Sequence, residues 1–178
     1  LTKAVRGWRG PVFSARPNVV RLLTTEAVID KMGYVMANPV AAGAVRYAKD
    51  WPGLCTRPGE LEAPGRTLPR PTAYFAKGTS KMPDTAELRY ELPACVRDAY
   101  GAQGGLDKVR DAVALHERRG RAEVARRGGR FLGPDRCRRV NPYKRAKAYE
   151  VFGGREPTFA TLGGGREAHE AAVADTRA

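Results

Sequence analysis

One short segment places an aromatic hydroxyl beside two charged side chains at helical spacing. Tyr34 follows Asp30 by four residues and Lys31 by three, so in a helix all three side chains share one face. A phenol oxygen can act as a nucleophile and later as a leaving group, and the neighbouring charges could position a phosphate or a metal ion. Spacing alone does not distinguish this chemistry from an aromatic side chain that packs into a core.

A dense group of basic side chains is the second feature with chemical consequences. The chain has 178 residues and a formal net charge of +13, which favours a polyanionic partner, nucleic acid above all. Between residues 118 and 147 only Glu123 and Asp135 are acidic. We predict phosphate contacts from Arg9 and from the basic residues of this stretch, which are Arg118, Arg119, Arg121, Arg126, Arg127, Arg130, Arg136, Arg138, Arg139, Lys144, Arg145 and Lys147. The alternative is an arginine-rich surface that is merely solvated.

The helix that must hold Tyr34 is bounded by a capping residue and a proline. Thr24 or Thr25 can cap its start, since a hydroxyl accepts a hydrogen bond from the first turn. Its apolar stripe would consist of Val28, Met32, Val35 and Met36. We expect Asn38 to close the helix, because the residue before a proline, here Pro39, disfavours helical geometry.

The chain beyond residue 56 begins with a change of composition. Residues 57–71 are rich in proline and glycine without an apolar period, so we expect an exposed linker. Short strands are predicted over residues 72–77 and 86–92, with a loose hairpin loop between them.

Glycine pairs mark the bounds of a second predicted helix. An amphipathic helix should begin after Gly104–Gly105 and end at Gly128–Gly129. Residues 130–165 are basic and turn-rich, whereas residues 166–178 show an alanine- and glutamate-rich pattern that is typical of a helix.

The cysteines and histidines predict no metal site within the chain. Cys55, Cys95 and Cys137 are some forty residues apart, which fits reduced thiols better than a disulfide framework or a metal knuckle. His116 and His169 are more than fifty residues apart, and each is interpreted as a residue on a polar helix face. No run approaches the roughly 18 apolar residues of a membrane helix, and no signal peptide begins the chain. We therefore expect a cytoplasmic, nucleoid-associated protein without a membrane partner.

The surroundings of Tyr34 match a longer pattern. Residues 33–43 read GYVMANPVAAG and are followed by Val45 and by Asp50–Trp51–Pro52. This segment resembles the Tyr-x-x-x-Asn-Pro-Val-x-x-Gly and Asp-Trp/Tyr-Pro signature of the repeat-associated, IS200-like single-tyrosine transposases. The upstream residues 9–13, RGPVF, resemble the Gly-x-Val-Phe/Trp stretch of the same family. The resemblance covers residues 6–55.

The resemblance implies a reaction and a site. Tyr34 would attack a phosphodiester of single-stranded or hairpin DNA, forming a 5′-phosphotyrosine and releasing a 3′-hydroxyl, with Mg²⁺ or Mn²⁺ as cofactor. Asp30, Lys31 and Asn38 would be its active-site neighbours. The family binds its metal through a His-hydrophobic-His pair ahead of the tyrosine, and this chain has no such pair. We therefore expect this chain to bind no metal alone and to be inactive unless joined to an upstream part.

The resemblance also implies a fold and a division of the chain. The expected class is α+β, with a partial antiparallel sheet and the tyrosine helix, followed by a basic, largely helical or irregular extension. Residues 1–56 would be the end of the catalytic domain, 57–71 the linker and 72–178 the extension. Because Leu1 is not a methionine and the last helical pattern has no stop signal, we expect a fragment cut at both ends. Lacking its sheet, the tyrosine helix should expose its apolar stripe.

Two other functions fit the same composition. The first is a basic nucleic-acid-binding module that derives from a transposase and has lost catalysis. The second is a ribosome-associated basic protein, which would prefer structured RNA to single-stranded DNA.

Overall fold

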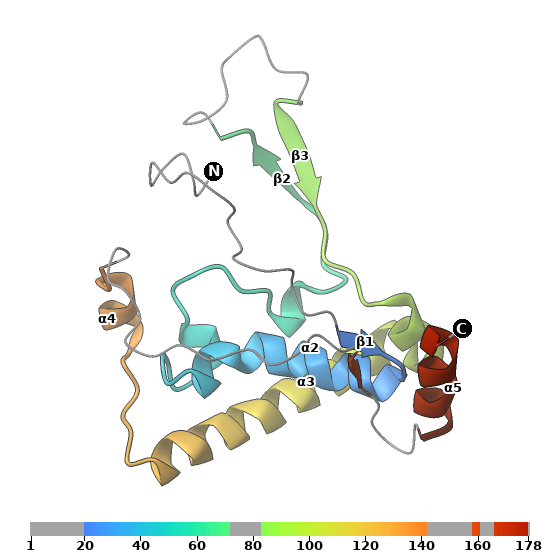
Figure 1. Cartoon of the computed structure of the whole chain (residues 1–178). Helices are drawn as coiled ribbons and strands as arrows, with labels where there is room; N and C mark the ends of the chain where they lie inside the picture. The colour runs from blue at the N-terminus through green and yellow to red at the C-terminus, as the bar shows by residue number, and fades with distance from the viewer. Residues whose placement is uncertain (1–19, 72–82, 142–157, 161–165, 178) are drawn as a thin grey trace, which may run out of the picture.

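The computed structural model describes residues 20–71, 83–141, 158–160 and 166–177 (Figure 1). The helices are α2 (Thr25–Ala41), α3 (Ala94–Arg126), α4 (Pro134–Arg138) and α5 (Arg166–Arg177), and the strands are β1 (Val20–Leu22), β2 (Arg66–Pro69), β3 (Thr85–Leu88) and β4 (Thr158–Ala160). Two 3-10 turns, η1 (Ala48–Asp50) and η2 (Pro58–Glu60), follow α2. Helices and a small antiparallel sheet place the described residues in the expected α+β class.

Helix α2 begins where the sequence predicts and ends later. The Thr24 hydroxyl accepts a hydrogen bond from the Ala27 N–H at 3.2 Å, so Thr24 is the N-cap. The prediction that Asn38 closes the helix is wrong, because Pro39 lies inside the last turn and the Asn38 carbonyl accepts a hydrogen bond from Ala42. A proline so near the C-terminus removes only one helical hydrogen bond, and full burial of Val40 offsets that loss.

Helix α3 begins at Ala94, twelve residues before the predicted start after Gly105, and bends at Gly101, where φ is +67°. The Gly104–Gly105 pair lies within the helix and does not mark its start. Gly105 permits a close contact there, since a Cβ added to it would lie 3.0 Å from side-chain carbons of Leu92 and Val96. The predicted end is confirmed. Gly128 has a φ of +64°, and the next N–H, that of Gly129, bonds to the Val124 carbonyl at 2.9 Å.

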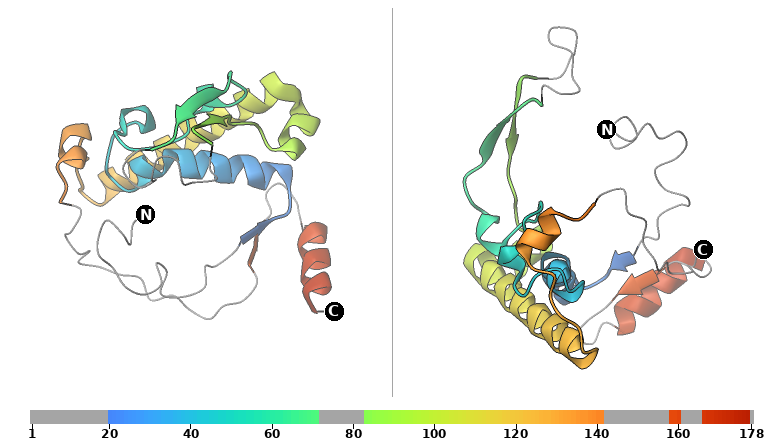
Figure 2. Two further views of the ribbon diagram at one scale, coloured as in Figure 1. Left: turned by 90° about the horizontal axis from the view of Figure 1, so that it is seen from above. Right: turned by 90° about the vertical axis from the view of Figure 1, so that its left-hand side faces the viewer.

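Helices α2 and α3 run in the same direction and pack closely against each other (Figure 2). Tyr100 near the start of α3 donates a hydrogen bond to Glu26 near the start of α2, at 3.0 Å. Farther along, a Cβ added at Gly33 would lie 2.7 Å from the Ala112 carbonyl carbon, so glycine permits the close approach. The core between the helices contains Ile29, Met36, Leu61, Leu92, Val96, Val109 and Val113.

The segment between the two helices is mostly exposed, as its composition predicts, and all four residues of β2 are exposed. Leu61, however, is buried in the core, and β2 pairs antiparallel with β3, with Arg66 opposite Leu88. The composition does not predict these two features, because one buried leucine and a cross-strand partner leave no trace in a proline- and glycine-rich segment. Of the predicted strand 86–92 only the first three residues belong to β3, and residues 72–77 lie outside the described residues.

The remaining elements lie near the two ends of the chain. Strand β1 pairs parallel with β4, Val20 opposite Thr158 and Leu22 opposite Ala160. The helix predicted from residue 166 onward is confirmed as α5. Among the described residues, no helix is both long enough and apolar enough to span a membrane.

Candidate functional site

Helix α2 presents three different faces, and Tyr34 lies on the exposed polar one. Ile29, Gly33 and Met36 are buried toward α3, and a second face lines an apolar groove. The Tyr34 side chain is 45% exposed, which is unusual for a tyrosine in the middle of a packed helix. Nearly half of the residue is therefore open to solvent.

A lysine and a histidine side chain contact the Tyr34 ring. The Lys31 Nζ lies 4.7 Å from the ring centroid, a distance at which an ammonium group is attracted by the aromatic face. On the side toward α3, the His116 and Tyr34 ring centroids are 6.0 Å apart, with the ring planes at 77°. This edge-to-face contact fixes the tyrosine ring between α2 and α3.

His116 is held in this place by Asp30. Its Nε2 lies 2.8 Å from the Asp30 Oδ1, and the two side chains are only 14% and 32% exposed. The interpretation of His116 as a residue on a polar helix face misses its partner on α2, since His116 follows Val109 and Val113 at spacings of seven and three residues and so lies toward α2. In the sequence, only this spacing indicated that His116 lies on the same face of α3 as Val109 and Val113. Its contact with a residue 86 positions away was not visible in the sequence.

The described residues near Tyr34 do not fit a divalent metal ion. Asp30 and His116 supply two donor atoms, and the described part of the chain holds no group of three His, Cys, Asp or Glu side chains that could bind one. Two protein donors fall short of a closed metal site, and the Lys31 ammonium adds a positive charge beside them.

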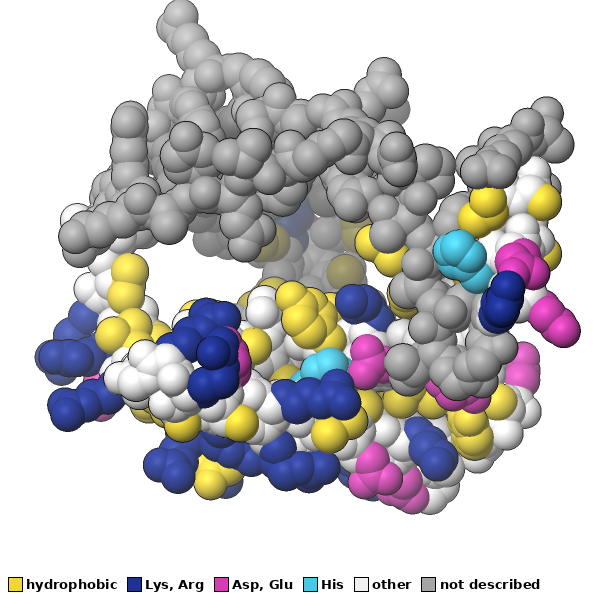
Figure 3. Space-filling model, turned by 60° about the horizontal axis from the view of Figure 1, so that its bottom comes forward, with side chains coloured by type: hydrophobic (Ala, Val, Ile, Leu, Met, Phe, Trp, Pro, Cys, Tyr) yellow, Lys and Arg dark blue, Asp and Glu magenta, His cyan; other side chains and the backbone are white. Residues whose placement is uncertain are grey.

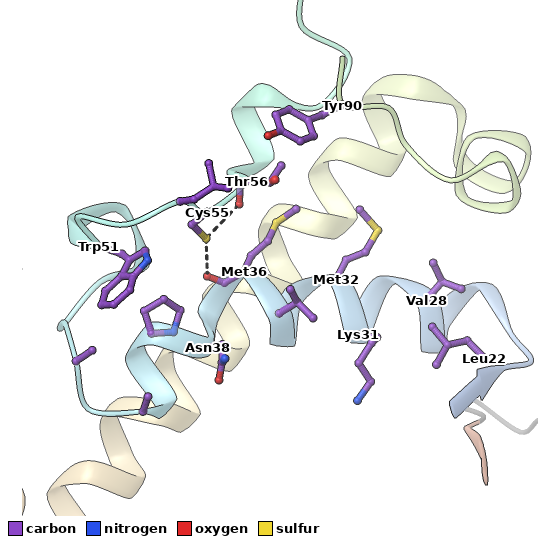
Figure 4. A pocket seen from close by; sticks show the side chains of 15 residues that line it. Leu22, Val28, Lys31, Met32, Met36, Asn38, Trp51, Cys55, Thr56 and Tyr90 are labelled. Carbon is purple, nitrogen blue, oxygen red and sulfur yellow. Dashed lines mark hydrogen bonds between the residues drawn. The ribbon is translucent and has the colours of Figure 1, made fainter. Parts of the chain in front are cut away.

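Asn38 lies one turn beyond Tyr34 and faces a different environment. Its exposed side chain and that of Lys31 lie along the groove of about 840 Å³ that the apolar face of α2 helps to line (Figure 4). Opposite this face are Trp51, Cys55, Thr56 and Tyr90. The predicted exposure of the apolar stripe is thus confirmed in part, because Val35 is 59% exposed whereas Met36 is buried.

Cys55 is anchored to the tyrosine helix across this groove. Its thiol lies 3.7 Å from the Met36 carbonyl oxygen, and burial raises the pKa of the thiol, an effect that the nearby Arg57 charge partly opposes. The thiol therefore stays protonated near neutral pH and ties the loop after α2 to the helix.

The predicted nucleic-acid-binding residues that the structure describes gather at one end of the helix pair. Figure 3 shows Lys and Arg side chains concentrated toward α4, with Asp and Glu more frequent toward α5. Hydrogen bonds from Arg126 first and Arg127 second lower the pKa of Glu123 to about 2, so these two charges are partly compensated. Arg121 pairs with Glu117 and Arg138 pairs with Asp135. Within the described ranges no acidic side chain pairs with Arg118, Arg119, Arg130, Arg136 or Arg139. Arg9, Lys144, Arg145 and Lys147 lie outside these ranges.

A second tyrosine at this end provides an internal comparison. Tyr47 is 40% exposed, and the Arg121 guanidinium carbon lies 4.9 Å and the Lys49 Nζ 5.8 Å from its ring centroid. Tyr47 thus shares exposure and cationic neighbours with Tyr34, but the only histidine contact to a tyrosine ring in the described residues is that of Tyr34.

The comparisons with known proteins add no assignment. No protein-family model matches the chain, and no curated protein or solved structure shows significant similarity to it.

Proposed function

We propose that the chain is part of a single-tyrosine DNA transposase in which the Tyr34 hydroxyl attacks a phosphodiester of single-stranded DNA. The observation that carries this proposal is the placement of an exposed phenol between Lys31 and the His116–Asp30 pair. The sequence resemblance around residues 33–43 singles out the same tyrosine.

The reaction is a balanced exchange of one phosphoester for another. The Tyr34 oxygen forms a bond to phosphorus as it loses its proton, the bond to the 3′-oxygen breaks, and that oxygen leaves with a proton as a 3′-hydroxyl. The Lys31 ammonium, 4.7 Å from the centroid of the Tyr34 ring, would stabilise negative charge that develops on the phenol and phosphate oxygens. His116, fixed by Asp30, holds the ring in one orientation, which keeps the nucleophile aligned.

DNA would be held by the arginine-rich end of the helix pair. Guanidinium groups without an acidic partner are available for phosphates, and such contacts give affinity without sequence selectivity. If about six phosphates are contacted, the logarithm of the association constant should fall with the logarithm of salt concentration with a slope of roughly −4 for single strands.

The test is formation of a covalent adduct between the tyrosine and DNA. Protein expressed from the complete gene is incubated with labelled hairpin DNA and Mg²⁺ or Mn²⁺, and adducts are separated on a denaturing gel. Tyr34→Phe should abolish the adduct. Tyr47→Phe is the matched control, because the two tyrosines are similar in exposure and cationic neighbours, and it should retain the adduct because the His116–Asp30 pair lies beside Tyr34. An adduct that survives Tyr34→Phe, or the absence of any adduct with the unaltered protein, would refute the proposal.

A non-catalytic nucleic-acid-binding module is the second candidate. The arginines of α3 and the following segment that pair with no acidic side chain in the described part of the chain, among them Arg118, Arg119 and Arg130, favour binding that needs no chemistry at Tyr34. In that case the unaltered protein binds single-stranded DNA with the salt dependence given above but forms no adduct, and Tyr34→Phe leaves the affinity unchanged.

A further inference from the structure

The chain after α3 folds back onto the loop that follows the tyrosine helix. Gly128, at a φ of +64°, reverses the chain direction. The N–H groups of Leu132 and Gly133 then donate hydrogen bonds to the carbonyls of Gly43 and Ala44, at 3.0 and 2.8 Å. This short backbone pairing fixes Arg130 and Phe131, which immediately precede it.

A pocket of about 460 Å³ lies where this segment meets the loop. Three arginines are among the residues that line it, Arg46, Arg121 and Arg130. The rest of its lining is apolar or backbone, from Val124, Ala125, Gly129 and Phe131. Its volume falls within the range of about 300 to 1,000 Å³ that is typical of small-ligand sites.

The charges of the pocket are unevenly compensated. Arg121 is held by Glu117 at 3.3 Å, donates to the Arg46 carbonyl at 3.4 Å and lies over Tyr47, so its position is fixed. The side chains of Arg46 and Arg130 have no acidic partner within the described part of the chain. Two uncompensated guanidinium groups beside an aromatic ring therefore define the chemistry of a ligand.

That chemistry selects an anionic group attached to a flat ring. A guanidinium binds phosphate oxygens in a planar, two-pronged geometry, and an aromatic side chain stacks on a nucleobase. An inorganic anion would leave the apolar lining without a partner, and an apolar ligand would leave two cations unpaired. A base in a duplex is already stacked, so a single strand is the form that can deliver one.

We propose that this pocket binds one nucleotide of single-stranded DNA, with its phosphate between Arg46 and Arg130 and its base against Phe131. The choice of DNA as the polymer rests on the proposed function. The pocket then determines how a strand passes the end of the tyrosine helix, because Gly43 and Ala44, which anchor it, directly follow α2.

The proposal is tested by equilibrium binding of a labelled oligothymidylate, followed by fluorescence anisotropy in the Tyr34→Phe background. Phe131→Leu keeps an apolar side chain and removes the stacking surface, so affinity should fall at least about fivefold, as expected for one stacked base. Arg46→Gln should weaken binding and reduce the salt slope by about one. The matched controls are Leu132→Ala, an exposed apolar neighbour, and Arg110→Gln, a cation paired with Asp107, and both should leave affinity unchanged. Circular dichroism establishes that each variant is folded.

Each other outcome overturns the assignment in an identifiable way. A loss with Arg46→Gln but not with Phe131→Leu indicates a phosphate site without a base. Equal losses for single-stranded and duplex DNA, or stronger binding of oligouridylate than of oligothymidylate, exclude single-stranded DNA as the selected ligand. Binding in the Tyr34→Phe background needs no covalent step. The effect of the pocket substitutions on affinity therefore remains valid even if the adduct assay fails. Conversely, if the Phe131→Leu variant forms the adduct normally, the pocket does not bind the strand during the reaction, whereas the transposase proposal is supported.

Discussion

Replacing Gly33 by alanine tests the contact that brings the tyrosine helix against α3. The added Cβ would lie 2.7 Å from the carbonyl carbon and the Cβ of Ala112 and 3.0 Å from its carbonyl oxygen. Carbon atoms rest at about 3.5 to 4.0 Å, so the helices must separate by several tenths of an ångström. Two of the three obstructing atoms belong to backbone, which cannot rotate away.

The magnitude follows from two opposing terms. Overpacking a tight contact costs about 1 to 3 kcal/mol, whereas alanine in a helix interior is favoured over glycine by about 1 kcal/mol. Approaches of 2.7 Å place the overpacking cost in the upper half of this range, about 2 to 3 kcal/mol, so the net loss is about 1 to 2 kcal/mol. For a chain of this size, each kcal/mol lowers Tm by about 2 to 4 °C, so the expected decrease is about 2 to 8 °C.

Thermal unfolding followed by circular dichroism measures this effect, with Gly104→Ala as the matched control. A Cβ at Gly104 would meet only the Tyr100 Cβ, at an ordinary 3.5 Å, so that variant should gain stability by about 0.5 to 1 kcal/mol. If Gly33→Ala raises Tm as much as Gly104→Ala does, the helices do not approach as closely as described, and the placement of His116 beside Tyr34 loses its basis.

Three further predictions concern caps and titrating groups. Thr24→Ala removes the N-cap hydrogen bond to Ala27 and should lower the free energy of unfolding by about 1 kcal/mol in urea denaturation. The pKa of Glu62 is lowered by hydrogen bonds from the Leu92 N–H first and Arg97 second, so its stabilising effect is present near neutral pH and is lost as the pH falls through the folded-state pKa. Glu62→Gln should therefore flatten the fall of Tm between neutral and acidic pH, and an unchanged profile would contradict this role. Because burial raises the pKa of Cys55, iodoacetamide should modify the exposed Cys95 first at neutral pH, as peptide mass spectrometry would show, and equal rates would contradict the burial of Cys55.

Local signals in the sequence predicted local structure well. Thr24 as a cap, the glycines after residue 127 and the helical pattern from residue 166 each depend on a few neighbouring residues, and each is confirmed. The start of α3 was missed because a glycine pair normally weakens a helix, whereas the burial of Gly105 against Leu92 and Val96 reverses that preference.

Long-range contacts account for what the sequence did not predict. The spacing of Asp30, Lys31 and Tyr34 on one helix face was sufficient to place Lys31 beside the tyrosine ring. His116 reaches the same site only because α3 packs along α2, and the Arg46–Phe131 pocket forms only because the chain returns past Gly43. Neither pairing leaves a pattern in residues close in sequence. The sequence therefore predicted the α2 residues of the candidate site but not its residue from α3, His116.

The shared direction of α2 and α3 has an electrostatic consequence. Peptide dipoles in each helix add up to a partial negative charge at its C-terminus. Ala41 and Arg126 end the two helices toward the same part of the molecule, so both negative poles face the cluster of guanidinium groups. The helix backbones thereby reduce the mutual repulsion of the arginines without occupying their hydrogen-bond donors, which leaves those donors available to an incoming polyanion.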